Sequence, residues 1–199
     1  MEKLQTTKQI VIFRRSDGDE MNDSTSPKNE YVHLTKSLLV GATVSNFEYW
    51  SEFIIRVQRE VRPTKDLLDI WGNIRIPPMF CLRLRNKWWV GSRDEWEKLM
   101  AKFPIKSPPG IPEETSVQAS VLVAMLEAKI VDIFISQTGD LDVSLSNGDE
   151  LHVQGAGGQW EESWFLELPI DEPDREKWSI ICMSDGAIHV RSPGLTIDR

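Results

Sequence analysis

The sequence has few of the residues that build metal centres and disulfides. Among its 199 residues are two cysteines and three histidines. Cys81 and Cys182 have no neighbouring Cys or His at zinc-ligand spacing, and their contexts favour two buried, free thiols over a disulfide. His33, His152 and His189 are isolated, and no two of them have the i, i+4 spacing of a metal site on a helix. We therefore expect neither a metal ion nor a cofactor.

Long apolar runs and an excess of basic residues are also lacking. No stretch of about 18 consecutive apolar residues occurs, so no transmembrane helix is predicted. The N-terminal residues have no long apolar run behind their basic residues. The formal net charge of -8 at pH 7 argues against general nucleic-acid binding, which needs a surplus of Lys and Arg. We expect a cytoplasmic protein without membrane contact.

Catalytic motifs are missing too. Ser163 follows Glu161 and Glu162, but no histidine lies beside it to act as a base, and His152 could approach it only through folding. Support of the backbone at the start of a strand is the favoured interpretation, ahead of partner contact and catalysis. The glycine-rich stretch at 155–159 lacks the lysine and the helix that follow a phosphate-binding loop, which favours a plain loop. We therefore expect no enzymatic activity.

Three carboxylates could form the acidic set of a nuclease: Asp140, Asp142 and Glu150. The segment that contains Glu150 carries no lysine to support an attacking water. A solvated turn is the favoured interpretation.

The charges and prolines that are present divide the chain. Residues 1–103 contain 17 basic residues (Lys and Arg) and 14 acidic residues (Asp and Glu), which gives a net charge of +3. Residues 104–199 contain 6 basic and 17 acidic residues, which gives a net charge of -11. Prolines cluster at the same point, and they interrupt both helices and central strands. We expect an N-terminal region over 1–103, a linker over 104–114 and a C-terminal domain over 115–199.

The N-terminal half is expected to contain helices joined to short strands. Apolar residues at spacings of three and four predict a helix over 45–61. A capping box of Ser45 and Glu48 would open this helix, and Pro63 would help to end it. A second, short helix is expected over 64–72.

The rest of the N-terminal half gives shorter signals. A short strand is expected at 8–14, followed by a mobile loop at 15–30 that has almost no apolar residues. Apolar and polar residues alternate over 80–85, which predicts a strand. A capping box at residues 92–95 predicts a helix over 93–103.

The C-terminal half predicts a helix followed by an antiparallel β-meander, so the fold class is α+β. The helix is expected over 116–128, and a strand follows with Val131, Ile133 and Ile135 on one side. The segment 141–153 alternates on both sides of Asn147–Gly148, which is typical of a tight hairpin. Further strands are predicted at 163–168, 178–183 and 187–191.

The hairpin and the segment after it resemble a small bacterial domain. A strand ends in GDL, an NG hairpin and a DELHV return strand follow, and a loop leads into ESW before another strand. This pattern, over about residues 121–191, resembles a domain of candidate immunity proteins encoded beside polymorphic or contact-dependent toxins. The residues that carry the resemblance are Gly139, Asp140, Leu141, Asn147, Gly148, Leu151, Val153, Glu162, Ser163 and Trp164.

We expect a non-enzymatic, immunity-type inhibitor that binds its cognate toxin, or another basic protein, through an acidic surface. A toxin that acts on nucleic acid presents a basic cleft, and opposite charges speed association. Trp160 is the expected apolar anchor, whereas Trp164 is assigned to the core. The residues expected at the partner surface are Asp149, Glu150, Trp160, Glu161 and Glu162.

The alternative is a nucleic-acid-associated or scaffold protein that uses the basic, aromatic stretch 75–89. Its Arg and Lys side chains would contact phosphates, and its tryptophans would stack on bases. The candidate residues are Arg83, Arg85, Lys87 and Trp88. The chain contains eight tryptophans, and we expect most of them in the core and one or two at an interface.

Overall fold

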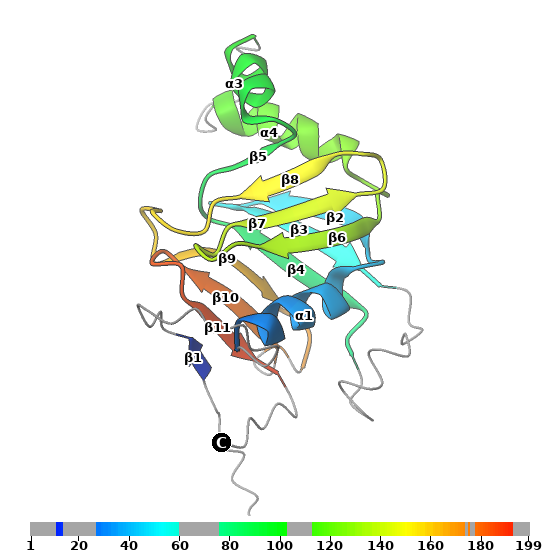
Figure 1. Ribbon diagram of the computed structural model, residues 1–199. Coiled ribbons are helices and arrows are strands. Elements are labelled where there is room, and N and C mark those ends of the chain that lie inside the picture. The colour runs from blue at the N-terminus through cyan, green and yellow to red at the C-terminus, as the bar shows by residue number, and fades with distance from the viewer. Residues whose placement is uncertain are drawn as a thin grey trace, which may run out of the picture.

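The computed structural model describes residues 11–13, 27–59, 76–102, 113–173, 175 and 178–192. These residues form two antiparallel sheets and three helices, so the expected α+β class is confirmed (Figure 1). The expected helical N-terminal half is not supported, because strands dominate the described part of that half. The short helix expected at 64–72 lies outside the described residues, as does most of the expected loop at 15–30.

Seven strands form a large sheet and four form a small sheet. The large sheet has the order β1 (Val11–Phe13), β11 (Ile188–Arg191), β10 (Ser179–Met183), β9 (Glu162–Glu167), β4 (Met79–Leu84), β3 (Phe53–Gln58) and β2 (Thr43–Tyr49). The small sheet has the order β5 (Trp88–Val90), β8 (Glu150–Val153), β7 (Leu141–Leu145) and β6 (Ile130–Ile135).

Both sheets contain strands from both sides of residues 103–112. β4 pairs with β9 in the large sheet, and β5 pairs with β8 in the small sheet. The ranges expected as separate regions, 1–103 and 115–199, therefore contribute to both sheets. Most of the expected linker at 104–114 lies outside the described residues.

The helices of the described chain are α1 (Pro27–Leu39), α3 (Arg93–Lys102) and α4 (Glu113–Ala124). α1 covers the large sheet, where Leu34 and Leu38 pack with Phe80, Leu166 and Ile180. α3 and α4 lie together beyond β5 and β8, at one end of the molecule (Figure 1). No helix within the described ranges is both long enough and apolar enough to cross a membrane.

The helix expected over residues 45–61 is wrong, because β2 and β3 form a hairpin there. Phe53, Ile55 and Val57 are all buried, so alternate side chains of β3 enter the core. Phe47, Trp50, Phe53 and Val57 also satisfy a helical spacing, but β-branched residues such as Ile55 and Val57 are better accommodated on a pleated strand. Packing against the rest of the large sheet decides between the two patterns.

One of the two expected capping boxes is present. Ser92 Oγ accepts a hydrogen bond from the backbone N–H of Glu95 at 3.3 Å and donates one to its carboxylate at 2.8 Å, at the start of α3. Ser45 and Glu48 do not form the second expected capping box. Both contact Arg56 across the hairpin, Ser45 at the backbone carbonyl and Glu48 at the guanidinium.

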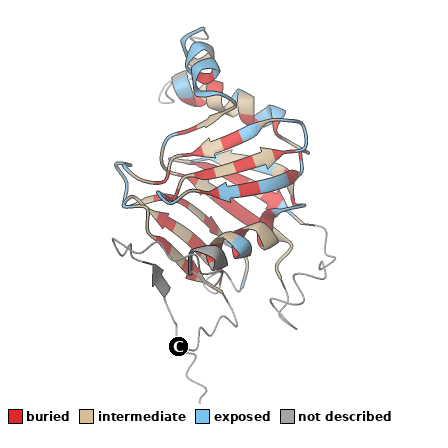
Figure 2. Cartoon of the chain, viewed as in Figure 1, coloured by how far each residue is buried: buried red, intermediate tan, exposed pale blue. Residues whose placement is uncertain are grey.

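The C-terminal strands lie close to their expected positions. β7 and β8 form the hairpin around Asn147–Gly148, and buried and exposed residues alternate along the strands (Figure 2). The strands do not form one meander, because β6 to β8 belong to the small sheet and β9 to β11 to the large sheet. Val131, expected on the buried side of β6, is 51% exposed because a bulge interrupts the pairing between Ile130 and Asp132.

Candidate functional site

The GDL and ESW motifs meet between the two sheets. Trp164 on β9 is completely buried, and its indole N–H donates a hydrogen bond to the carbonyl oxygen of Gly139 at 2.7 Å. A Cβ at Gly155 would lie 2.2 Å from the carbonyl carbon of Gly139, and a Cβ at Gly139 would lie 2.5 Å from Cys182 Sγ. Only glycine allows this approach. We call Gly139, Gly155, Ser163, Trp164 and Cys182 the glycine junction.

Polar side chains satisfy backbone groups at the glycine junction. Ser163 is completely buried, and its hydroxyl donates to the carbonyl oxygen of Gly155. Asp140 Oδ1 accepts from the N–H of Gly155 at 2.8 Å, and Oδ2 accepts from the hydroxyls of Ser136 and Thr138. Burial raises the pKa of Asp140, but these hydrogen bonds outweigh burial and lower the pKa below its usual value. These polar residues therefore hold the fold together.

Both cysteines are free and buried, as the sequence predicts. Burial raises the pKa of the Cys182 thiol to about 12, and it also raises the pKa of Cys81. A thiol needs to ionise to act as a nucleophile. Neither cysteine is therefore poised for chemistry at neutral pH.

The two arginines of the expected nucleic-acid strand are paired with carboxylates. Arg83 Nη1 donates to Glu52 Oε1 at 2.8 Å, and Arg83 Nε lies 2.7 Å from Glu167 Oε1. Arg85 Nε donates to the other oxygen of Glu52 at 2.5 Å, and Arg85 Nη1 contacts Glu162. Burial lowers the pKa of Arg83, but Glu52 and Glu167 outweigh it and raise the pKa above its usual value. The positive charge of both arginines is therefore compensated within the protein.

The other two residues of the expected nucleic-acid patch have different environments. Trp88 is 5% exposed and packs edge-on against Phe53, with 5.3 Å between ring centroids. Lys87 is exposed. Of the four candidate residues, Lys87 is exposed, Arg83 and Arg85 are half-buried and Trp88 is buried, so the structure does not bring them together as one open surface.

The turn between β2 and β3 and the loop before β9 form an exposed aromatic corner. Trp50 is 77% exposed and Trp160 is 52% exposed. The indole N–H of Trp50 donates to Glu48 Oε2 at 3.2 Å, which holds the ring outward from the turn. Trp160 and Glu52 line a small pocket of about 120 Å³. We call Trp50, Glu52, Trp160 and the exposed Glu161 the tryptophan corner.

The structure separates the five residues expected at the partner surface. Trp160 and Glu161 belong to the tryptophan corner, and Glu162 begins β9 and is held in an ion pair. Asp149 and Glu150 lie at the β7–β8 turn. That turn is at the opposite end of β8 from the loop that leads to Trp160, so the expected acidic rim is divided between two places.

The three expected nuclease carboxylates are also divided. Asp140 lies beside the glycine junction, whereas Asp142 Oδ1 accepts a hydrogen bond from His152 Nδ1 at 2.7 Å on the small sheet. Glu150 lies 3.6 Å from the other nitrogen of His152, and the ring of Trp89 stacks on that histidine. Within the described ranges, no group of three or more His, Cys, Asp or Glu side chains is arranged to hold a metal ion.

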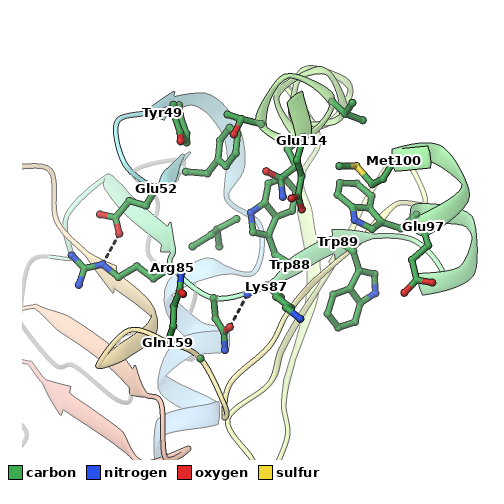
Figure 3. A pocket seen from close by; sticks show the side chains of 18 of the residues that line it. Tyr49, Glu52, Arg85, Lys87, Trp88, Trp89, Glu97, Met100, Glu114 and Gln159 are labelled. Atoms are coloured by element: carbon green, nitrogen blue, oxygen red, sulfur yellow. Dashed lines mark hydrogen bonds and ion pairs between the residues drawn. The ribbon is translucent and has the colours of Figure 1, made fainter. Parts of the chain in front are cut away.

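A large cleft opens beside the tryptophan corner, between the strands and the helices α3 and α4. Its volume is about 1140 Å³, and Glu52 lines both this cleft and the small pocket. The rings of Tyr49, Phe53, Trp88 and Trp96 form a continuous row with centroid separations of 4.9, 5.3 and 5.5 Å. Figure 3 shows the side chains that β5 and the two helices contribute. We call this space the aromatic cleft.

Sequence reasoning missed Tyr49, Trp50 and Glu52 as site residues because it placed them on a helix. The signal that could have found them is the short apolar run from Phe53 to Val57, which contains three β-branched residues. That pattern is typical of a strand that follows a turn. A hairpin places both residues at its tip, where Trp50 is exposed and Glu52 is held by Arg83 and Arg85.

Comparison with known proteins supplies no relative for this chain. No family model matches it, and no curated protein and no solved structure matches it significantly.

Proposed function

We propose that the protein is a non-enzymatic, immunity-type inhibitor that binds its cognate toxin through the tryptophan corner. One observation carries this proposal: Trp50 and Trp160 lie exposed at a corner whose small pocket includes Glu52. Tryptophan is enriched at the hot spots of protein interfaces, where a few large side chains supply most of the binding energy. An exposed indole that lines a pocket, with a second exposed indole on the turn that forms the pocket wall, has the composition of such a hot spot.

The charges at the tryptophan corner favour a basic partner. Glu161 is exposed and forms no ion pair with any described residue. The nearby Arg83 and Arg85 are compensated by carboxylates, so they do not offset the charge of Glu161. The chain as a whole has a formal net charge of -8. Opposite charge speeds association and fixes the register of a complex, and a toxin that acts on nucleic acid has a basic cleft of this kind.

The environments of the potential nucleophiles support binding over catalysis. The Ser163 hydroxyl is buried and donates to a backbone carbonyl, and the Cys182 thiol is buried with a raised pKa. The motif residues that resemble the immunity domain serve internal contacts at the glycine junction. They leave the tryptophan corner, outside the motif, as the part of this region that is open to a partner.

The proposal is tested with the purified product of the adjacent gene as the candidate toxin. We expect a stable complex that weakens as salt rises, measured by titration calorimetry and by surface kinetics. Trp160→Ala should weaken binding by about thirtyfold or more, the effect of losing a hot-spot side chain. Glu161→Lys should slow association and flatten its salt dependence, because a rim charge acts mainly on the association rate.

Ile170→Ala provides the matched control. Ile170 is 77% exposed, but it lies in the loop after β9, away from the tryptophan corner. Its truncation should leave binding within about twofold of the unchanged protein. Equal losses for Trp160→Ala and Ile170→Ala, or no loss for Trp160→Ala in a complex that does form, would contradict the proposed surface.

A further inference from the structure

Two separate segments of the chain build the tryptophan corner, and both lie beside the end of β4. Trp50 belongs to the turn between β2 and β3, whereas Trp160 belongs to the loop before β9. At the end of β4, Leu84 is opposite Phe53 of β3 on one side and Trp164 of β9 on the other. A side chain that follows β4 can therefore reach both segments.

Arg85, the residue after β4, is ion-paired to both segments. Its Nε donates to Glu52 Oε2 on the turn at 2.5 Å, and its Nη1 donates to Glu162 at the start of β9. In these pairs the side chain of Arg85 is 31% exposed and that of Glu52 is 9% exposed. In the described part of the chain, Arg85 alone is ion-paired to both the turn and the start of β9, because Arg83 pairs with Glu52 and with Glu167 at the far end of that strand.

The position of the Arg85 guanidinium is itself fixed by its surroundings. The guanidinium lies 5.0 Å from the centre of the Phe165 ring, and the backbone N–H of Arg85 donates to the carbonyl oxygen of Ser163 at 3.0 Å. Arg85 also lines the small pocket together with Trp160. A guanidinium has five donors in a rigid, planar fork, so it can bind two carboxylates at once. An arginine at this position can therefore hold two segments in one arrangement.

We propose that Arg85 is the positioning residue of the tryptophan corner, which holds the turn that carries Trp50 against the loop that carries Trp160 before a partner binds. This inference rests on the proposed function, because it concerns the same surface. A partner that meets a preorganised surface does not have to order it, so less of the interaction energy is lost on binding. Loss of Arg85 should weaken the complex although both tryptophans remain.

The first test measures the affinity for the product of the adjacent gene by calorimetry. Arg85→Gln removes the charge and the fork, and it should weaken binding by about tenfold. Arg85→Lys keeps the charge but has no fork to bridge two carboxylates, so it should recover only part of this loss.

Arg93→Gln is the matched control. Arg93 is also ion-paired, to Glu97 at 3.4 Å, and it also lies over an aromatic ring, that of Trp89 at 5.2 Å. It belongs to α3 and does not line the small pocket. Its substitution should leave binding within about twofold of the unchanged protein.

The second test follows the indole N–H signals of the isotope-labelled full chain by NMR without a partner. Glu162→Gln changes one segment, and the Trp50 signal reports on the other. We expect Glu162→Gln to move the Trp50 signal in the unchanged protein but not in the Arg85→Gln background, because Arg85 transmits the change. The Trp164 signal, from an indole bonded to Gly139 in the core, shows whether each variant is folded.

The role of Arg85 and the proposed function fail separately. A complex that Trp160→Ala weakens and Arg85→Gln leaves unchanged would overturn the role of Arg85 and keep the proposed function. Absence of any complex would overturn the proposed function, and the Trp50 signal would still decide the role of Arg85. A Trp50 signal that Glu162→Gln moves equally with and without Arg85, or moves in neither background, overturns that role. Should Arg85→Gln fail to fold, Arg85→Lys takes its place in both measurements.

Discussion

The glycine junction and the tryptophan corner lie next to each other along the chain but have opposite environments. Trp164 is completely buried and bonded to Gly139, whereas Trp160 is 52% exposed and its indole has no acceptor among the described residues. The junction satisfies its polar groups internally, whereas at the corner the Trp160 indole and the Glu161 carboxylate have no partner among the described residues. This difference teaches that the motif residues serve the fold, and that the residues proposed for binding lie among their neighbours.

The two regions also treat charge differently. At the glycine junction, the carboxylate of Asp140 is held by three hydrogen bonds from nearby groups. At the tryptophan corner, Glu52 is held between two arginines, but Glu161 remains exposed. A buried charge has to be satisfied within the fold, whereas an exposed one is free to steer a partner. Substitutions in the two regions should therefore affect different measurements.

The largest expected effect is that of Trp164→Ala. Truncating a fully buried tryptophan removes its packing, leaves a cavity and takes away the donor to Gly139. We expect the free energy of unfolding to fall by about 3–5 kcal/mol, measured by urea denaturation. Trp160→Ala is the control and should change the free energy of unfolding by less than about 0.5 kcal/mol. A stable Trp164→Ala variant beside an unfolded Trp160→Ala variant would mean that the two regions are assigned the wrong way round.

The sequence predicts the C-terminal strands well because their signals are local. In the segment 141–153 the alternation and the Asn147–Gly148 turn fix the hairpin without help from the rest of the chain. Ser92 and Glu95 likewise open α3 by contacts within one turn. The assignment of Trp164 to the core is confirmed for the same reason, since it lies on a short, clearly apolar strand.

The sequence predicts the β2–β3 hairpin poorly because two periods compete there. Phe47, Trp50, Phe53 and Val57 fit a helical spacing, and only pairing with β4 makes the strand the better solution. The tryptophan corner and the wall of the aromatic cleft both depend on this hairpin, so the residues that its turn contributes to them were missed. The allocation of consecutive strands to two sheets is likewise a long-range property that no local pattern contains.

The second effect concerns the close approach of backbone at the glycine junction. A Cβ at Gly155 would lie 2.2 Å from Gly139 and 2.4 Å from the carbonyl oxygen of Thr138, so Gly155→Ala forces the backbone apart. We expect a loss of about 1–3 kcal/mol in the free energy of unfolding. Gly158→Ala, in the same loop, meets only the flexible side chain of Asn86 at 3.0 Å and should cost less than about 1 kcal/mol. Equal costs would contradict the close packing at Gly155.

The smallest expected effect is a pH dependence of stability at the glycine junction, through Asp140. Burial raises the pKa of Asp140, but the hydrogen bonds from Gly155, Thr138 and Ser136 lower it by a larger amount. The pKa in the folded protein therefore lies below the ordinary value of about 4. The unfolded chain therefore binds the proton more readily. The stability that Asp140 contributes is complete above the ordinary pKa and is lost as the pH falls through the lowered one.

Asp140→Asn should thus be less stable than the unchanged protein at pH 7, by less than about 1 kcal/mol because the site is partly open to solvent. The difference should shrink as urea denaturation is repeated from pH 6 down to pH 3. A difference that stays constant over this range would show that Asp140 acts through its shape and not through its charge.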